Sequence, residues 1–461
     1  MPSGVGVMSK QIVLGTCHHY NWCQLGGAMQ HAEQGKIINM DQALKDTTGI
    51  QDASLTIYPV SGYGNPDLIR QLIEKEKPDA IMHFTDPRFW GWLYNMEHEI
   101  RQHIPLIYYN IWDDLPIPYY NKDFYMSCDL LLGISKQTVN INKAVLGEGN
   151  YKEWQCQYVP HGINEADYYP INEEMPQYLE LLKKKKQLFG DVDPEFVIMY
   201  NSRNIRRKMT SDIMIAYNMF TKQLPKEIAE KCYLILHTQP VDEAGTNLYE
   251  IAEKLTSDAK IILHDAKVTE FELNLMYNIA DVTINVSSAE GWGLGNTESL
   301  MAGTMTITNT VGGLQDQSRF VDENDNWVEL TSDFPSNSCG RYKNCGEWTL
   351  PIFPQLNLVG SVPTPYIYDS RADIKDIIDQ LYVCYNFGRD ERKRKGLKGR
   401  EWVISDESKM SAKWMSQNIM SCIDILFNNF TPRKKFELLE TIHQTISHPA
   451  GVYNPSEEKW Y

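Results

Sequence analysis

The chain has 461 residues, 42% of them hydrophobic and 23% charged, a composition typical of globular proteins and a length that allows two or three domains. Its 44 basic and 60 acidic side chains leave a net charge of −16, which repels nucleic acids and anionic membranes at long range and argues against a large nucleic-acid footprint. No apolar run is long enough to span a membrane, and nine scattered cysteines without paired CxxC motifs predict reduced thiols and a cytoplasmic location.

In the first part of the chain, short apolar runs alternate with helical patterns. The helix expected at 65–77 has apolar residues at helical spacing. Short apolar strands separated by helices are typical of parallel sheets that are buried on both faces. We expect such strands at 11–16, 79–84, 104–111 and 129–135, with a small-residue turn at 25–30 after the first strand.

The pattern starts again after a boundary at 158–164. Further strands are expected at 195–203, 232–238, 260–265, 281–288 and 304–310, with a helix at 211–224. Two successive strand–helix halves predict an α/β fold of two doubly wound, Rossmann-like domains facing a cleft, in which ligands bind at the carboxyl ends of the strands. The expected domains are 1–165 and 166–430, followed by a C-terminal tail at 431–461.

Three other segments have a distinct composition. Residues 325–370 are rich in Pro, Gly, Asn and aromatic residues, which predicts an irregular insertion in the second domain. The stretch from 372 to 430 is mostly helical in pattern. The one basic run, Lys183–Lys186, is interpreted as a solvated helix face because a run of four like charges has little specificity.

The segment Ser287–Gly303, "SSAEGWGLGNTESLMAG", has the pattern of a strand end, a glycine-rich turn and a helix. We expect Asn296 to be the helix N-cap and Gly303 its C-terminal stop. Glycines let main-chain N–H groups approach a ligand, and the helix start favours negative charge. Glu290 ends the strand and Glu298 follows in the first helical turn. Either carboxylate alone is compatible with an ordinary surface acid, whereas the pair on this element favours a ligand site.

This segment resembles the donor-binding half of retaining glycosyltransferases of the GT-B type, particularly family 4. Their signature is two glutamates separated by seven residues within a glycine-rich turn, here Glu290 and Glu298, followed by a Gly-Gly pair. A second match lies upstream in "YNSRNIRRKM", where Arg203 and Lys208 follow a strand. Together the matches cover most of residues 158–425, and they imply the GT-B fold and glycosyl transfer.

The resemblance implies that Arg203 and Lys208 stabilise the diphosphate that leaves when the bond to the donor sugar breaks. Positive charge next to a departing diphosphate is the largest stabilising effect available without a metal ion. Arg206 and Arg207 share the same stretch and can take part of this role. A surface salt bridge is the alternative interpretation of Arg203 and Lys208.

The remaining donor contacts are also implied by the resemblance. Glu290 would hold hydroxyls of the donor sugar, and Glu298 would accept from the ribose. The segment 265–268, which ends at Val268, is expected beside the base, and Gly27 is expected near the diphosphate. Main-chain N–H groups for phosphate or sugar are expected at Gly291, Trp292, Gly293 and Leu294.

The N-terminal half, which binds the acceptor in this family, matches less well. Candidate acceptor residues are His83, Asp86 and Trp90, in an unusual aromatic-rich stretch; aromatic side chains stack on sugars but are equally common in cores. Asp113 is a further catalytic candidate, because it stands where many relatives have a histidine-containing turn. Asp113 and Asp114 are adjacent, and adjacent acids at a strand end chelate metal poorly.

The implied reaction transfers a hexose, by default from a UDP- or GDP-sugar, to an unidentified hydroxyl with retention of configuration and without a metal or other cofactor. Alternatives are a transferase acting on hydroxymethylated DNA bases, a sugar-nucleotide 2-epimerase and a non-catalytic nucleotide-sugar-binding module. A glycoside hydrolase also needs two carboxylates, but its acids are not expected on a phosphate-binding turn beside Arg and Lys.

Overall fold

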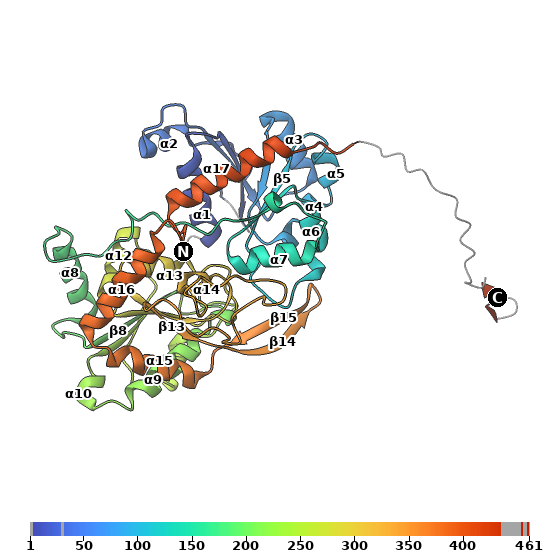
Figure 1. Cartoon of the computed structure of the whole chain (residues 1–461). Helices are drawn as coiled ribbons and strands as arrows, with labels where there is room; N and C mark the ends of the chain where they lie inside the picture. Colours follow the sequence, from blue (N-terminus) through green and yellow to red (C-terminus); the bar gives the residue numbers. More distant parts are fainter. Residues whose placement is uncertain (1–2, 29–31, 435–452, 455–458, 461) are drawn as a thin grey trace.

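The structure, a computed structural model, describes residues 3–28, 32–434, 453–454 and 459–460. Most of these residues form two α/β domains, each built on parallel strands with helices outside them (Figure 1). The N-terminal domain is blue to cyan in the figure, and the C-terminal domain is green to orange. Part of the expected tail is described: Tyr453–Asn454 and Lys459–Trp460 pair as the short strands β16 and β17.

The N-terminal domain contains two sheets. One has the order β1-β3-β2, with β1 parallel and β2 antiparallel to β3, and the other is parallel in the order β4-β5-β6-β7. The strands are β1 (Trp22–Ala28), β2 (Ile38–Asn39), β3 (Leu55–Ser61), β4 (Ile81–His83), β5 (Leu106–Asn110), β6 (Leu130–Gly133) and β7 (Cys156–Tyr158). The helices are α1 (Gly4–Thr16), α2 (Asp41–Thr48), α3 (Pro66–Glu76), η1 (Pro87–Trp90), α4 (Gly91–Tyr94), α5 (Glu97–Ile100), η2 (Tyr119–Asn121), α6 (Lys122–Met126), α7 (Lys136–Leu146) and η3 (Glu153–Gln155).

Two expectations for the N-terminal domain are wrong. The predicted strand at 11–16 is the second half of helix α1, because Met8, Ile12 and Thr16 lie four residues apart and form one buried helix face. The predicted turn at 25–30 is part of strand β1 as far as Ala28; its last two residues lie outside the described residues. The other three strands expected in this half, and the helix α3 that begins after the N-cap Asn65, are confirmed.

The C-terminal domain is a single parallel sheet in the order β10-β9-β8-β11-β12-β13. Its strands are β8 (Phe196–Asn201), β9 (Cys232–His237), β10 (Ile261–His264), β11 (Val282–Asn285), β12 (Met305–Asn309) and β13 (Thr349–Ile352). Its helices are α8 (Tyr178–Phe189), η4 (Arg206–Lys208), α9 (Thr210–Thr221), α10 (Lys226–Ala229), α11 (Leu248–Lys254), α12 (Glu270–Ile279), α13 (Leu294–Met301), α14 (Gly312–Ser318), α15 (Ile374–Asn386), α16 (Arg389–Val403) and α17 (Ala412–Asn429).

The strand order of this domain defines where a ligand can bind. The chain runs from β8 outward through β9 and β10, and then crosses back to β11 on the other side of β8. The order of the strands therefore reverses between β8 and β11, and in open parallel sheets ligands bind beyond the carboxyl ends of the strands at this point. All five strands that the sequence predicts in this half are confirmed.

The expected irregular insertion at 325–370 is only partly irregular. Its end supplies β13 to the main sheet and an antiparallel hairpin of β14 (Gln355–Ser361) and β15 (Thr364–Arg371). The hairpin contacts both domains: Tyr368 N donates to Leu115 O at 2.6 Å in the N-terminal domain, and Ser370 N donates to Ser288 O at 3.3 Å in the C-terminal domain. The insertion thus joins the two domains.

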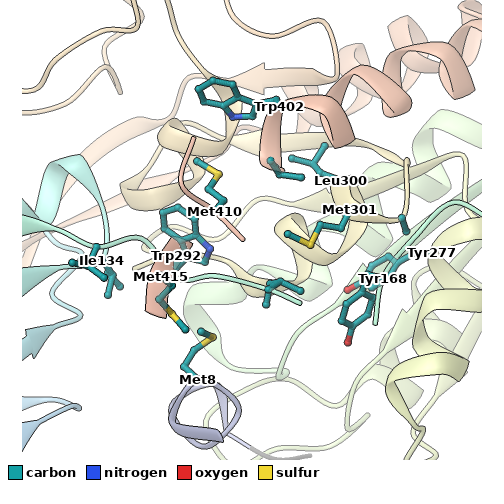
Figure 2. Packing of buried hydrophobic residues seen from close by; sticks show 14 of the residues in the cluster. Met8, Ile134, Tyr168, Tyr277, Trp292, Leu300, Met301, Trp402, Met410 and Met415 are labelled. Carbon is teal, nitrogen blue, oxygen red and sulfur yellow. The ribbon is translucent and has the colours of Figure 1, made fainter. Parts of the chain in front are cut away.

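A hydrophobic core also continues from one domain into the other (Figure 2). Trp292 of the glycine-rich segment is buried against Met410 and Met415, and the same cluster includes Met8 of α1 and Ile134 after β6. Helix α17 closes this arrangement, because it returns from the C-terminal domain to pack on α1 (Figure 1).

Three further predictions can be compared with the structure. No helix in the described part of the chain is long and apolar enough to cross a membrane. All nine cysteines are free thiols. The basic run Lys183–Lys186 lies on α8 and is partly to fully exposed, with Lys183, Lys185 and Lys186 each paired to a surface carboxylate.

Candidate functional site

Two loops meet where the strand order reverses. The first leaves β8 and forms the short helix η4, and the second leaves β11 and leads into α13. A main-chain hydrogen bond of 2.7 Å from Ser288 N to Arg207 O joins them. The loops thereby bring the two sequence motifs together, although more than 80 residues separate Lys208 from Glu290 in the chain.

The centre of the site is a buried ion pair between Lys208 Nζ and Glu290 Oε2. Each side chain is only 9% exposed, and Ser287 Oγ donates to the same carboxylate at 3.3 Å. Burial lowers the pKa of Lys208 to about 8, and the charge of Arg207 acts in the same direction. Burial alone would raise the pKa of Glu290, but the charges of Lys208 and Arg207 overcome it and hold the pKa below its ordinary value. The pair is therefore charged at neutral pH.

The structure places Arg207 and Arg203, which belong to the same stretch "YNSRNIRRKM", in different surroundings. Arg207 Nη1 donates to Ala289 O and lies 3.9 Å from Glu290 Oε1. Arg203 lies at the rim, where its Nε and Nη2 donate to the two carboxylate oxygens of Asp242 at 2.6 and 3.0 Å. Of the two residues that the family resemblance assigns to the diphosphate, Lys208 is in the centre of the site and Arg203 is held outside it.

Glu298 is the second carboxylate of the signature, and it is buried with partners of its own. It accepts from Tyr277 Oη at 2.8 Å and from Asn201 Nδ2 at 3.4 Å. Burial raises its pKa to about 7, although the hydrogen bond from Tyr277 opposes this shift. A carboxylate fixed in this way can accept hydrogen bonds from ligand hydroxyls.

The glycine-rich turn presents free main-chain donors. Among the described residues, no group accepts a hydrogen bond from the N–H groups of Gly291, Trp292, Gly293 or Leu294. The expected N-cap at Asn296 is wrong, because α13 already begins at Leu294 after Gly293, whose φ of 88° is in the left-handed region. The expected stop at Gly303 agrees with its φ of 81° directly after the C-cap.

A second glycine pair fixes the turn from behind. Gly313 N donates to Gly291 O at 3.1 Å. A Cβ atom at Gly313 would lie 2.6 Å from the Trp292 ring, and one at Gly312 would overlap Glu290 O. The Gly-Gly that follows the signature therefore allows α14 to pack directly against the loop that carries Glu290.

Trp292 takes part in the site through its main chain alone. Its indole is buried in the core cluster of Figure 2, and its Nε1 donates to Thr297 Oγ1 at 3.0 Å. The side chain therefore anchors the glycine-rich turn and leaves only the N–H of residue 292 available to a ligand.

The N-terminal domain touches the turn through the loop after β5. A Cβ atom at Gly291 would lie 3.0 Å from Ile111 O and 3.9 Å from Asp113 Cβ. Burial raises the pKa values of Asp113 and Asp114, while the charge of Arg207 opposes the shift in both. Asp113 thus lies beside the glycine-rich turn, in the electrostatic field of Arg207 and Glu290.

The predicted acceptor residues lie in an aromatic cluster. His83 is buried, its Nδ1 is 2.6 Å from Tyr94 Oη, and burial lowers its pKa to about 3. Trp90 packs against His83 with ring centroids 5.2 Å apart. Asp86 is the N-cap of η1 and pairs with Arg88. His83 and Trp90 thus have the surroundings of core residues.

The two remaining donor candidates, Val268 and Gly27, belong to other segments of the two domains. Val268 is half-buried in the loop between β10 and α12. Gly27 lies near the end of β1, where an added Cβ would be 3.3 Å from Gly62 O and 3.9 Å from the Trp90 ring. Within the described part of the chain, no hydrogen bond joins either residue to Lys208 or Glu290.

Sequence reasoning missed two residues that fix Glu298. Tyr277 belongs to α12 and Asn201 ends β8, and the two are joined to each other by a hydrogen bond of 2.7 Å. The position of Asn201 at a strand end of the switch point is a signal that could have identified it. Tyr277 lies within an amphipathic helix and carries no such signal.

No protein-family model and no curated protein matches the sequence. Solved structures do match it. A glycosyltransferase from Rickettsia africae is 14% identical with a TM-score of 0.60, covering 92% of this chain and 96% of that one. Sucrose-phosphate synthase from Thermosynechococcus elongatus is 15% identical with a TM-score of 0.63, covering 92% and 94%. HepE from Anabaena, solved with UDP and glucose, is 12% identical with a TM-score of 0.57, covering 92% and 97%.

These similarities extend over both domains and identify the architecture. The chain has the two-domain GT-B fold of these glycosyltransferases, and the fold that the family resemblance implied is confirmed. At this level of identity the likeness defines the fold, while the chemistry has to be argued from the site.

Proposed function

We propose that the protein is a glycosyltransferase that takes a hexose from a nucleotide-sugar and transfers it to a hydroxyl acceptor. The observation that supports this proposal most is the Lys208–Glu290 pair beside the free N–H groups of residues 291–294, at the switch point of a GT-B fold. Buried positive charge and unpaired main-chain donors together form a site for a diphosphate.

The two ends of the ion pair have different roles in this proposal. The Lys208 ammonium has three N–H donors and uses one on Glu290, so the others are available to phosphate oxygens. The free acceptor capacity of Glu290 binds hydroxyls of the donor sugar. Glu298, held by Tyr277, accepts from the ribose hydroxyls.

We propose the course of reaction that the family resemblance implies, with the charges of this site in the roles that it assigns. The bond between the anomeric carbon and the diphosphate oxygen breaks, and its electron pair stays on the diphosphate. Lys208 and the N–H groups of residues 291–294 stabilise that charge in a site with little solvent. The acceptor hydroxyl attacks the same face of the sugar and gives its proton to a diphosphate oxygen, so the configuration is retained and no metal ion is required.

The environment of the two glutamates argues for transfer over glycoside hydrolysis. A hydrolase needs one protonated acid and one carboxylate that face the same bond. Here Glu290 is committed to Lys208, and Glu298 is committed to Tyr277. UDP-sugars are the first donors to test, because HepE, which shares the fold, was solved with UDP and glucose.

The test is a thermal-shift screen of the wild type and Lys208→Ala against UDP-, GDP-, ADP- and dTDP-hexoses with EDTA present. A ligand that binds only the folded state raises the melting temperature. We expect one nucleotide class to stabilise the wild type and to lose most of its effect on the variant. If none of the four shifts the wild type, the proposal is wrong. Incubation of the wild type with the donor that binds then separates the alternatives: release of UDP without a glycoside product indicates an epimerase, and binding without turnover indicates a binding module.

A further inference from the structure

The second cation of the site is a separate question, because Arg203, which precedes η4, is turned away from Glu290, whereas Arg207, which lies within η4, is near it. Arg203 donates twice to Asp242, and its side chain is 66% exposed. Arg207 lies inward, and its main-chain carbonyl accepts from Ser288 in the loop that leads to Glu290.

The pairing of Arg203 is built into the structure around it. Asp242 Oδ1 also accepts from Ala244 N at 2.9 Å, and Ala244 O in turn accepts from Arg206 N at 2.7 Å. The bidentate contact therefore ties the loop after β8 to the loop after β9. A diphosphate would have to displace a carboxylate from Arg203 and would leave Asp242 without that partner.

Arg207 has donors to spare and is accessible. Its side chain is 41% exposed, and of its five N–H donors only Nη1 donates to a described residue, at Ala289 O. The Arg207 guanidinium is close to Glu290 of the C-terminal domain and to Asp113 and Asp114 of the N-terminal domain. Burial alone would lower the pKa of Arg207, but the negative charges of these carboxylates more than offset that effect and raise the pKa. The guanidinium is thus held charged at the junction of the two domains, next to the Lys208 ammonium.

We propose that Arg207, in place of Arg203, is the second cation that binds the diphosphate of the donor, and that Arg203 is a positioning residue that fixes the loop carrying Lys208. This inference rests on the proposed function, since it names a phosphate ligand of the same site. A planar guanidinium can bind two phosphate oxygens at once, so it complements the single point charge of Lys208.

The experiment compares Arg207→Gln, Arg203→Gln and Arg206→Gln with the wild type in binding of UDP and of uridine, measured by calorimetry. Arg206 is the matched control. The sequence also made it a candidate for the diphosphate, but its side chain is exposed and has no hydrogen-bond or ion-pair partner among the described residues, so the structure gives it no place beside Glu290. Uridine lacks the phosphates, so the ratio of the two affinities isolates the phosphate contact. Inorganic pyrophosphate, as a competitor of UDP, provides a second measurement that does not depend on the base.

We expect Arg207→Gln to weaken UDP by about 10- to 100-fold, the range of a hydrogen bond to a charged group, and to leave uridine unchanged. Arg206→Gln should bind both as the wild type does. Arg203→Gln should melt at a lower temperature and bind UDP within about threefold of the wild type, because it loses a mostly exposed ion pair. Arg207→Lys should recover part of the lost UDP affinity.

The contrary outcomes are distinct. If Arg203→Gln loses UDP selectively while Arg207→Gln binds it normally, the inference is overturned and the proposed function stands. If the wild type binds neither UDP nor the GDP, ADP or dTDP analogues, the proposed function fails and the inference fails with it. If Arg207→Gln does not fold, Arg207→Lys decides, since it keeps the charge but cannot bind two oxygens; unchanged UDP and pyrophosphate affinity in that variant would count against the inference.

Discussion

At the residue scale, the site depends on a lysine whose charge is kept by its neighbours against the effect of burial. Lys208 has a pKa lowered to about 8 by burial and by Arg207, while Glu290 draws it upward. Its ammonium is therefore present at neutral pH and is lost as the pH rises above that value. The same burial that weakens the charge strengthens its effect on a bound diphosphate.

This balance predicts an alkaline limit on activity. The pH dependence of kcat/KM reports groups of the free enzyme, so kcat/KM should fall above a pH of about 8 as Lys208 loses its proton. Lys208→Arg stays charged in this range, so its residual activity should show no such fall. A wild-type profile that is flat to pH 9.5 would contradict the role of Lys208.

The raised pKa of Glu298 predicts how the stability of the fold depends on pH. Its pKa rises on folding from 4.5 to about 7, so between these values the folded state keeps a proton that the unfolded chain releases. Stability should fall as the pH rises through this window, by about 3 kcal/mol at its end. Glu298→Gln removes this group. Urea unfolding at pH 5 and 7.5 should show a larger loss for the wild type than for the variant, and equal losses would refute the shift.

At the element scale, the strand–turn–helix unit works because glycines allow two segments to approach each other. Gly312 has a φ of 45°, and any Cβ there would overlap Glu290 O. Gly312→Ala should therefore displace Glu290 and cost both stability and activity, with a loss of about 2 kcal/mol or more. Gly190→Ala is the control: it shares a positive φ but has nothing within 4 Å. If the two variants lose the same free energy of unfolding and the same activity, the close approach of Glu290 is not the reason why residue 312 is a glycine.

The elements also show how far sequence reasoning reaches. All strands of the C-terminal sheet up to β12 were predictable, because each is a short apolar run between helical patterns. The segment 11–16 was not, because an apolar run of this length has the same pattern on the buried face of α1 as in a strand. The hairpin β14–β15 escaped prediction because it lies within a stretch rich in Pro, Gly and Asn, and because β14 is exposed on both faces although Leu356 and Leu358 alternate with polar residues.

The candidate site was partly predictable for a similar reason. Glu290, Glu298 and Lys208 stand at fixed spacings within local motifs, and such spacings are visible in one sequence. Arg203 is turned away from Glu290 by its ion pair with Asp242, which lies 39 residues away in a different loop. No local sequence pattern predicts such a long-range contact. The difference between Arg203 and Arg207 could therefore be seen only in three dimensions.

At the scale of the whole molecule, the two domains share a core instead of meeting at a separate interface. One buried cluster joins Met8 and Ile134 of the N-terminal domain to Trp292 and Met301 of the C-terminal domain and to Met415 of α17 (Figure 2). Domain interfaces within a chain are usually more polar than this. The position of the glycine-rich turn relative to Asp113 thus depends on the packing of both domains.

This shared core predicts cooperative unfolding. Calorimetry should show one thermal transition for both domains, and Met415→Ala should lower it as a whole, by about 2–5 kcal/mol of stability, because the residue is fully buried in the cluster. Two separate transitions, with only one of them shifted by the variant, would show that the domains are independent.

The central claim is that a nucleotide-sugar loses its diphosphate at Lys208, and the most direct measurement is the rate of nucleoside diphosphate release from the donor found in the thermal-shift screen, with EDTA present. The account predicts release by the wild type and a rate lower by about 100-fold or more in Lys208→Ala, the loss typical of removing one group that stabilises charge in the transition state. Equal rates in the two proteins would contradict it.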